Sequence, residues 1–215
     1  MHNLKYAFWG ILIIPTVLWL LAEPGVFQPA DFMALRGDMV QYSGIIAIAC
    51  MSVAMILSLR PRWPERWIGG LDKMYRLHKW LGIAALVTSV VHWLWGQGPK
   101  WAVGLGLIER PVRGARPAIE NPIEALFMSL RGSAEGVGEW AFYLAVLLIA
   151  LALIRYFPYH LFFKTHRVLA AVYLLLAFHT VVLTKFAYWT SPVGVVMALL
   201  LASGAVVTCT TALLT

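Results

Sequence analysis

Hydrophobic positions along the chain form six long blocks separated by polar stretches. The apolar blocks cover about residues 4–22, 40–59, 77–96, 139–157, 166–185 and 192–213. An α-helix needs about 20 apolar residues to cross the hydrocarbon core of a bilayer, and each block has about that length. Backbone groups cannot stay unpaired in lipid, so every block is predicted to be a helix. The pattern predicts an all-α, polytopic membrane protein, with residues 1–215 forming one six-transmembrane-helix bundle.

Composition excludes most other classes. The 215 residues are 61% hydrophobic and only 13% charged, which is typical of polytopic membrane proteins. The formal net charge of +7 therefore indicates topology and does not predict nucleic-acid binding. Cys50 and Cys209 fall inside apolar blocks, so we interpret them as small core residues and expect no disulfide framework.

The charged residues between the blocks predict the orientation. The segment between the second and third blocks carries Arg60, Arg62, Arg66, Lys73 and Arg76 against Glu65 and Asp72. Lys5, Arg155 and Lys164 belong to the same side, whereas the first loop holds Glu23, Asp31 and Asp38 against Arg36. The positive-inside rule then places both termini in the cytoplasm. We expect an integral protein of the bacterial inner (plasma) membrane, with its first span retained.

Two of the predicted spans carry a histidine near each end. His78 and His92 are 14 positions apart in the third span, and His166 and His179 are 13 apart in the fifth. Ionisable residues inside a membrane are costly, so they are functional candidates. At 1.5 Å rise per residue each pair spans roughly 20 Å, with one histidine toward each face. Because both spans run in the same direction, His78 is predicted beside His166, and His92 beside His179.

Matched histidines on two helices suit axial ligation of heme iron. Two axial nitrogens on one iron are only about 4 Å apart, so each heme must bridge the two helices. A single membrane histidine is more often a hydrogen-bonded packing residue, but four of the six histidines form matched pairs; His2 and His160 need no such role. The pattern predicts two stacked b hemes. Thirteen residues turn an α-helix by about 140°, so either the fifth span is over- or underwound or its hemes lie against different sides.

The long loop at residues 97–138 is expected on the outer side. Asn121, Pro122 and Glu124 form a helix-start pattern, which predicts a short interfacial helix over the outer mouth. Before it come Arg110, Arg113 and Arg116, which either attract an anionic acceptor and pair with heme propionates, or are simply solvated. Tyr173, midway along the fifth span, lies either between the hemes or in the packed core.

The stretches LHKWLGIAALVTSVVH and HRVLAAVYLLLAFH resemble the third and fifth helices of the ferric-reductase transmembrane domain. Ferric-chelate reductases and NADPH oxidases share that domain. It is also similar to the heme-binding membrane subunit of the periplasmic methionine sulfoxide reductase system. The resemblance implies that His78 and His166 ligate the iron of the inner heme, and His92 and His179 that of the outer heme. It also implies electron flow from a cytoplasmic reduced flavin to an acceptor outside.

Ferric reductases and oxidases usually continue into flavin- and NADPH-binding domains, whereas this sequence ends at Thr215 and has no GxGxxG motif. FAD and NAD(P)H are therefore expected on a missing domain or on a partner subunit. We expect the membrane module of an oxidoreductase that delivers electrons to a ferric chelate, oxygen or a redox protein. The alternative is a heme-binding subunit that serves a periplasmic reductase, and a non-redox structural subunit is disfavoured by the histidine pairs.

Overall fold

The computed structural model describes residues 2–109 and 119–213. This part of the chain contains helices and no strands. The α-helices are α1 (His2–Ala22), α2 (Phe32–Ser58), α3 (Arg62–Ile68), α4 (Leu71–Gly104), α5 (Pro122–Leu153), α6 (Tyr159–Leu183) and α7 (Pro192–Leu213). Two short 3-10 helices, η1 (Pro24–Phe27) and η2 (Phe186–Thr190), complete the order.

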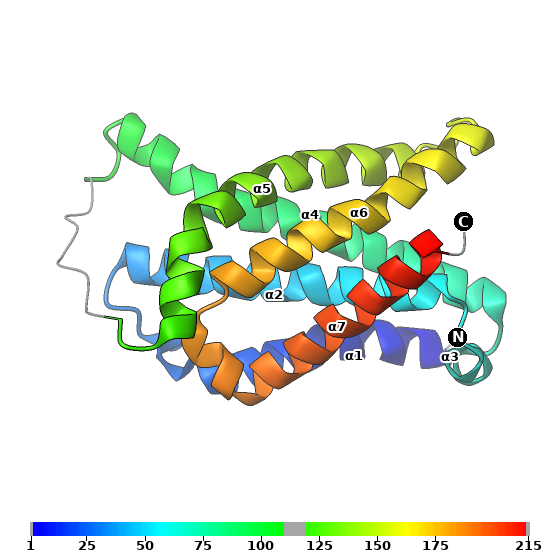
Figure 1. Cartoon of the computed structure of the whole chain (residues 1–215), viewed down its shortest axis with the longest axis horizontal. Coiled ribbons are helices and arrows are strands. Elements are labelled where there is room, and N and C mark those ends of the chain that lie inside the picture. Colours follow the sequence, from blue (N-terminus) through cyan, green and yellow to red (C-terminus); the bar gives the residue numbers. More distant parts are fainter. Residues whose placement is uncertain (1, 110–118, 214–215) are drawn as a thin grey trace.

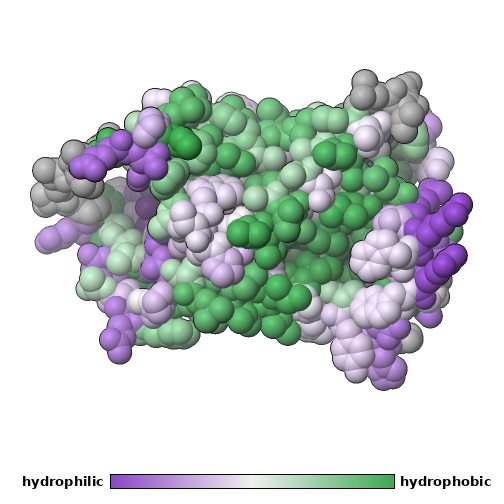
Figure 2. Space-filling view, turned by 60° about the horizontal axis from the view of Figure 1, so that its bottom comes forward, coloured by the Kyte–Doolittle hydropathy of each residue, from purple (hydrophilic) through white to green (hydrophobic). Residues whose placement is uncertain are grey.

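Six of these helices are long and apolar enough to cross a membrane, which confirms the predicted all-α six-helix bundle. They are α1, α2, α4, α5, α6 and α7. The start of α1, the end of α7, α3 and the turn between α5 and α6 all lie at one end of the bundle (Figure 1). Figure 2 shows a broad apolar belt in the middle of the molecule and hydrophilic residues at both ends. This distribution is the one that a bilayer requires.

Several helices extend well beyond the apolar blocks. Asp31 caps α2, because its Oδ1 accepts a hydrogen bond of 2.7 Å from the N–H of Ala34. Asn121 caps α5 as predicted, since its Oδ1 accepts from the N–H groups of Ile123 and Glu124. The prediction of a separate interfacial helix after Asn121 is wrong. Residues 122–153 form one helix, whose first part crosses the end of the bundle before the helix turns to run along it (Figure 1).

The extension of α4 contains a proline whose missing N–H is compensated by a neighbouring helix. Pro99 has no N–H to give to the carbonyl of Trp95, four residues earlier. Arg36 of α2 takes its place: Nε donates to the Trp95 oxygen and Nη2 to the Gly96 oxygen, both at 3.0 Å. The same contact therefore satisfies α4 and joins it to the start of α2.

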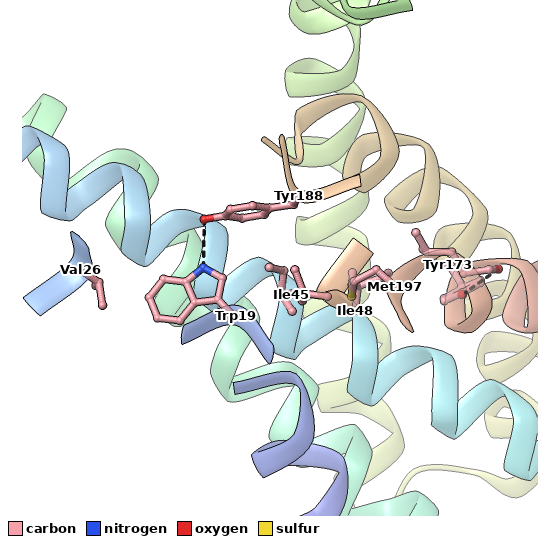
Figure 3. Packing of buried hydrophobic residues seen from close by; sticks show 9 residues of the cluster. Trp19, Val26, Ile45, Ile48, Tyr173, Tyr188 and Met197 are labelled. Atoms are coloured by element: carbon pink, nitrogen blue, oxygen red, sulfur yellow. Dashed lines mark hydrogen bonds between the residues drawn. The ribbon is translucent and has the colours of Figure 1, made fainter. Parts of the chain in front are cut away.

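Aromatic side chains join the helices in the core. Trp19 of α1 donates a 3.2 Å hydrogen bond to the hydroxyl of Tyr188 in η2 (Figure 3). Tyr173 of α6 is fully buried, and its hydroxyl lies 2.9 Å from that of Ser52 in α2. A Cβ added at Gly204 of α7 would overlap the Tyr173 hydroxyl. Tyr173 thus points toward α2 and α7 as a packing residue, which supports the second of the two interpretations of its role.

Opposite charges join three segments at the end of the bundle that holds η1 and η2. Lys185 donates to Asp38 Oδ1 at 2.7 Å and also to Glu23, which in turn accepts a 2.6 Å hydrogen bond from Tyr188. Burial raises the pKa of Glu23, but the hydrogen bonds from Lys185 and Tyr188 lower it by more, so it lies below its ordinary value. Burial lowers the pKa of Lys185, and its hydrogen bonds to the two carboxylates raise it by more.

We predict that Arg36→Ala lowers the free energy of unfolding by about 2 kcal/mol, because two carbonyls lose a charged donor. For a chain of this size that corresponds to a melting temperature lower by roughly 4–8 °C. In the Pro99→Ala background the loss should be smaller, since residue 99 then supplies its own N–H to Trp95. Arg131→Ala, which removes only an exposed pair with Glu135, is the control. Equal losses in both backgrounds, measured by thermal unfolding in detergent, would contradict the assignment.

We predict an acid-sensitive stability that depends on Glu23. Its depressed folded pKa means that its contribution is present above the unfolded value of 4.5 and is lost as the pH falls through the folded value. The melting temperature of the unaltered protein should therefore fall between about pH 5 and pH 3, and Glu23→Gln should flatten that part of the curve. Glu120→Gln, at an exposed position, is the control. Parallel curves for Glu23→Gln and the unaltered protein would refute the role of this carboxylate.

Candidate functional site

The structure brings the four intramembrane histidines together as two pairs between α4 and α6. The ring centroids of His78 and His166 are 5.8 Å apart, and those of His92 and His179 are 6.1 Å apart. The partners are those that the sequence spacing predicts, although their ligand role stays a prediction. His2 lies at the start of α1 and His160 near the start of α6, both exposed and outside these pairs.

Three of the four imidazoles are oriented by backbone carbonyls. Nδ1 of His78 lies 3.0 Å from the Ala54 oxygen, and Nδ1 of His92 lies 2.9 Å from the Val40 oxygen. Nδ1 of His179 lies 2.8 Å from the Ala134 oxygen. A carbonyl only accepts, so the proton is assigned to Nδ1 in each ring. The Nε2 lone pair is then free to bind a metal, the arrangement usual for ligating histidines.

Glycines give the imidazoles access to two of these carbonyls. In an α-helix the carbonyl of Val40 faces the N–H of Gly44, and that of Ala134 faces the N–H of Gly138. A Cβ at Gly44 would lie 3.1 Å from His92 Cε1, and one at Gly138 would overlap the ring of His179. Both helices therefore need glycine where a histidine side chain approaches the backbone.

His166 differs from the other three histidines. Its Nδ1 is buried and has no hydrogen-bond partner among the described residues. The ring stacks on Phe162, one turn earlier in α6, with centroids 5.0 Å apart and an interplanar angle of 17°. α6 is α-helical from Tyr159 to Leu183, with no π-helical turn. Regular winding favours the alternative in which the two pairs lie against different sides of α6.

The pair formed by His92 and His179 opens into a cavity of about 670 Å³. Much of its wall is apolar, and six of the lining residues are glycines: Gly37, Gly44, Gly96, Gly132, Gly136 and Gly138. Arg36, Lys100 and Arg131 also line it, as do Glu135 and Glu139. Space left by glycines suits a flat apolar group, and Lys100 suits a carboxylate on its edge. The other two cations already have protein partners, since Arg36 donates to backbone carbonyls and Arg131 pairs with Glu135. Arg110, Arg113 and Arg116, which the sequence suggested as propionate partners, lie outside the described residues.

The residues present fit a b heme. Two imidazoles on opposite sides of one iron have their ring centroids about 6 Å apart, from iron–nitrogen bonds of about 2 Å. Both observed separations match that value. Within the described part, no three His, Cys, Asp or Glu side chains are placed to hold a metal ion together. Each histidine pair thus offers two ligands and leaves the remaining positions to a macrocycle.

Fold and site together define a helical integral membrane protein with paired histidines inside the membrane. The chain belongs to the ferric reductase-like transmembrane component family, whose model matches residues 43–177. Membership indicates transmembrane electron transfer by a membrane oxidoreductase component. The matched segment contains His78, His92 and His166, and His179 lies two positions beyond it. Comparison with curated proteins found no match, and neither did comparison with solved structures.

Sequence reasoning missed the residues that support the histidines. The carbonyls of Val40, Ala54 and Ala134 are backbone groups, and no side-chain pattern marks them. Gly44, inside an apolar block, and Gly138, at the edge of another, were the available signals, because glycine is unfavourable inside a helix unless packing requires it.

We predict that Gly138→Ala disrupts the site of His92 and His179 while leaving that of His78 and His166 intact. The new methyl group occupies the position of the His179 ring, so this imidazole must leave the Ala134 carbonyl. Gly204→Ala is the control, since its Cβ meets the hydroxyl of Tyr173, a fully buried residue away from both pairs. Reduced-minus-oxidised spectra should show loss of about half the b-type heme signal in Gly138→Ala alone. Equal retention of heme in the two variants would contradict the prediction.

Proposed function

We propose that this chain is a transmembrane electron conduit that holds two b hemes and connects a cytoplasmic donor to an acceptor on the outer face. The observation that carries the proposal is the pairing of His78 with His166 and of His92 with His179, with ring centroids about 6 Å apart. When bound, the two hemes supply redox-active irons that exchange single electrons. The chain's own residues would hold those groups in series, 14 residues apart along α4 and 13 apart along α6.

The histidines determine how an acceptor must react. If a heme were bound at each pair, the two histidines of that pair would supply both protein ligands of its iron and would leave no position for an acceptor. An acceptor therefore approaches the cavity beside His92 and His179 and does not become an iron ligand. Lys100 lies on the wall of this cavity, where it favours an anionic acceptor such as a ferric chelate, whereas Arg131 on the same wall pairs with Glu135. Oxygen fits the same outer-sphere chemistry.

The donor side follows from charge. The segment Arg60–Arg76, which includes α3, lies at the same end of the bundle as the start of α1 and the end of α7. Its excess of basic residues supports a cytoplasmic position in a bacterial inner membrane, with both termini inside. His78 and His166 are nearer to that end. FAD and NAD(P)H would be bound by a dehydrogenase domain or partner subunit that docks at this end. The described residues are taken up by the helical bundle and include no separate domain for these cofactors.

We predict two low-spin hemes b per chain, and the selective loss of one of them in His179→Ala. The two sites share helices but no ligands, so removing His179 should leave His78 and His166 in place. Pyridine-hemochrome analysis of the purified protein should give about two hemes for the unaltered chain and about one for the variant. His160→Ala, at an exposed position outside both pairs, is the control. One heme in the unaltered protein would refute the two-site proposal.

We predict electron entry at the end of the bundle that contains Arg60–Arg76. In liposomes with all chains in one orientation, a reduced flavin on that side should reduce an impermeant ferric chelate on the other side. Reduction only with donor and acceptor exchanged would overturn the proposed topology and direction together. Heme reduction without transfer to ferric chelate or oxygen would instead favour the alternative, a heme-binding membrane subunit that passes electrons to a periplasmic reductase partner.

A further inference from the structure

A second cavity, a groove of about 270 Å³, lies on the surface between α1 and α4. It is at the end of the bundle where α1 begins, far along α4 from His92. Its lining combines three cations, three aromatic side chains and one leucine. The residues that matter are Lys5, Phe8 and Trp9 from α1, and Lys73, Arg76 and Trp80 from α4. Among the described residues, no carboxylate is part of this lining.

Along both α1 and α4, a basic residue of the groove comes before a tryptophan of the groove. Lys5 precedes Trp9 by four residues, and Arg76 precedes Trp80 by four. Four residues are about one helical turn, so each cation lies on the same face of its helix as the tryptophan that follows it. The cation is about 6 Å nearer the end of the bundle. Lys73 adds a third cation one turn further out. Positive charge therefore lies at the membrane edge of the groove, and aromatic surface lies at the deeper level of the apolar belt.

The cations of the groove are not used by the protein itself. Within residues 2–109 and 119–213, no ion pair or side-chain hydrogen bond engages Lys5, Lys73 or Arg76. Trp9 is 56% exposed and Trp80 is 50% exposed, so both rings are available to a bound molecule. Three unneutralised charges beside exposed aromatic rings attract a ligand that is anionic at one end and apolar at the other.

We propose that this groove binds one anionic phospholipid. Lys5, Lys73 and Arg76 hold the phosphate, and Phe8, Trp9 and Trp80 pack along the start of an acyl chain. Basic pockets between helices on the cytoplasmic side of a membrane are suited to acidic headgroups, and the end of the bundle that holds the groove carries the excess of basic residues. A free phosphate would use only the cations, whereas a phospholipid also covers the aromatic side chains. The bound lipid joins α1 to α4.

The groove is independent of the histidine pairs. At 100° per residue, Lys73, Arg76 and Trp80 fall within about 60° of one another on α4, and His78 lies about 140–160° away from Lys73 and Trp80. Lipid binding and heme binding thus use opposite sides of this helix. Variants in the groove should leave the heme content unchanged, which gives a direct check that they fold.

The test is native mass spectrometry of the purified chain in detergent, titrated with phosphatidylglycerol, phosphatidylcholine or inorganic phosphate. Phosphatidylglycerol should be retained one per chain and should displace phosphatidylcholine, and inorganic phosphate should not compete at equal concentration. Lys5→Gln, Lys73→Gln and Arg76→Gln should each weaken phosphatidylglycerol binding about fivefold, and their effects should combine in the triple variant. Trp80→Ala should weaken it without changing the charge.

A matched triple variant removes the same charge outside the groove: Arg62→Gln, Arg66→Gln and Lys79→Gln. It should retain phosphatidylglycerol at nearly the unaltered affinity. Equal losses in the two triple variants would show general attraction to the basic end and would overturn the site. Equal retention of phosphatidylglycerol and phosphatidylcholine would overturn it as well, and so would full competition by inorganic phosphate. If the groove triple variant does not fold, the single variant Arg76→Gln is compared with Lys79→Gln. A fivefold loss of phosphatidylglycerol binding in Arg76→Gln alone supports the site, and equal binding by the two variants overturns it.

Discussion

Hydrogen bonds from intramembrane imidazoles to backbone carbonyls are the constraint on which the rest of the arrangement depends. A ring N–H buried away from water needs an acceptor, and in a helix bundle nearly all carbonyls are already paired within their own helices. Gly44 and Gly138 resolve this conflict, because each leaves room for a histidine to reach the carbonyl four residues earlier. α2 thereby orients both histidines of α4, through Val40 and Ala54, and α5 orients His179 of α6. These are also the two pairs of helices that pack most extensively.

The cavity beside His92 and His179 lies where α4 and α5 extend beyond the apolar blocks. α4 continues past Pro99 while Arg36 donates to the Trp95 carbonyl, which Pro99 leaves without an N–H, and to the neighbouring Gly96 carbonyl. α5 begins across the end of the bundle and then turns to run along it (Figure 1), and His179 contacts its backbone at the Ala134 carbonyl. These two extensions carry Lys100 and Arg131 to the wall of the cavity. A bundle of six straight helices ending at the apolar boundaries would present the histidines without an enclosing wall.

The sequence predicted the six spans and the partners within each histidine pair, because hydropathy and helical rise depend only on local residues. It did not predict where the helices end. Phe32–Val40 and residues 122–138 contain polar residues and glycines, which by themselves are typical of loops, and only contacts with other helices keep them helical. The sequence identifies Asn121 as a cap, but it gives no local signal for the bend that follows in α5 (Figure 1). The ion pairs of Lys185 were not predictable for the same reason. The hydropathy pattern places Lys185 within a span, and its partners Glu23 and Asp38 come from the other end of the chain.

The two ends of the bundle are held in different ways. At the end with η1 and η2, Lys185, Glu23, Asp38 and Tyr188 form charged and hydrogen-bonded contacts between α1, α2 and η2, and Arg36 joins α2 to α4. The opposite end has a contact from Asn3 to the Trp67 carbonyl, while Lys5, Lys73 and Arg76 are left without protein partners in the described chain. Under the proposed function, fixed contacts suit the end where the cavity beside His92 and His179 would have to keep its shape for an acceptor. Cations without protein partners would suit the other end, where the proposed lipid and the proposed donor would bind.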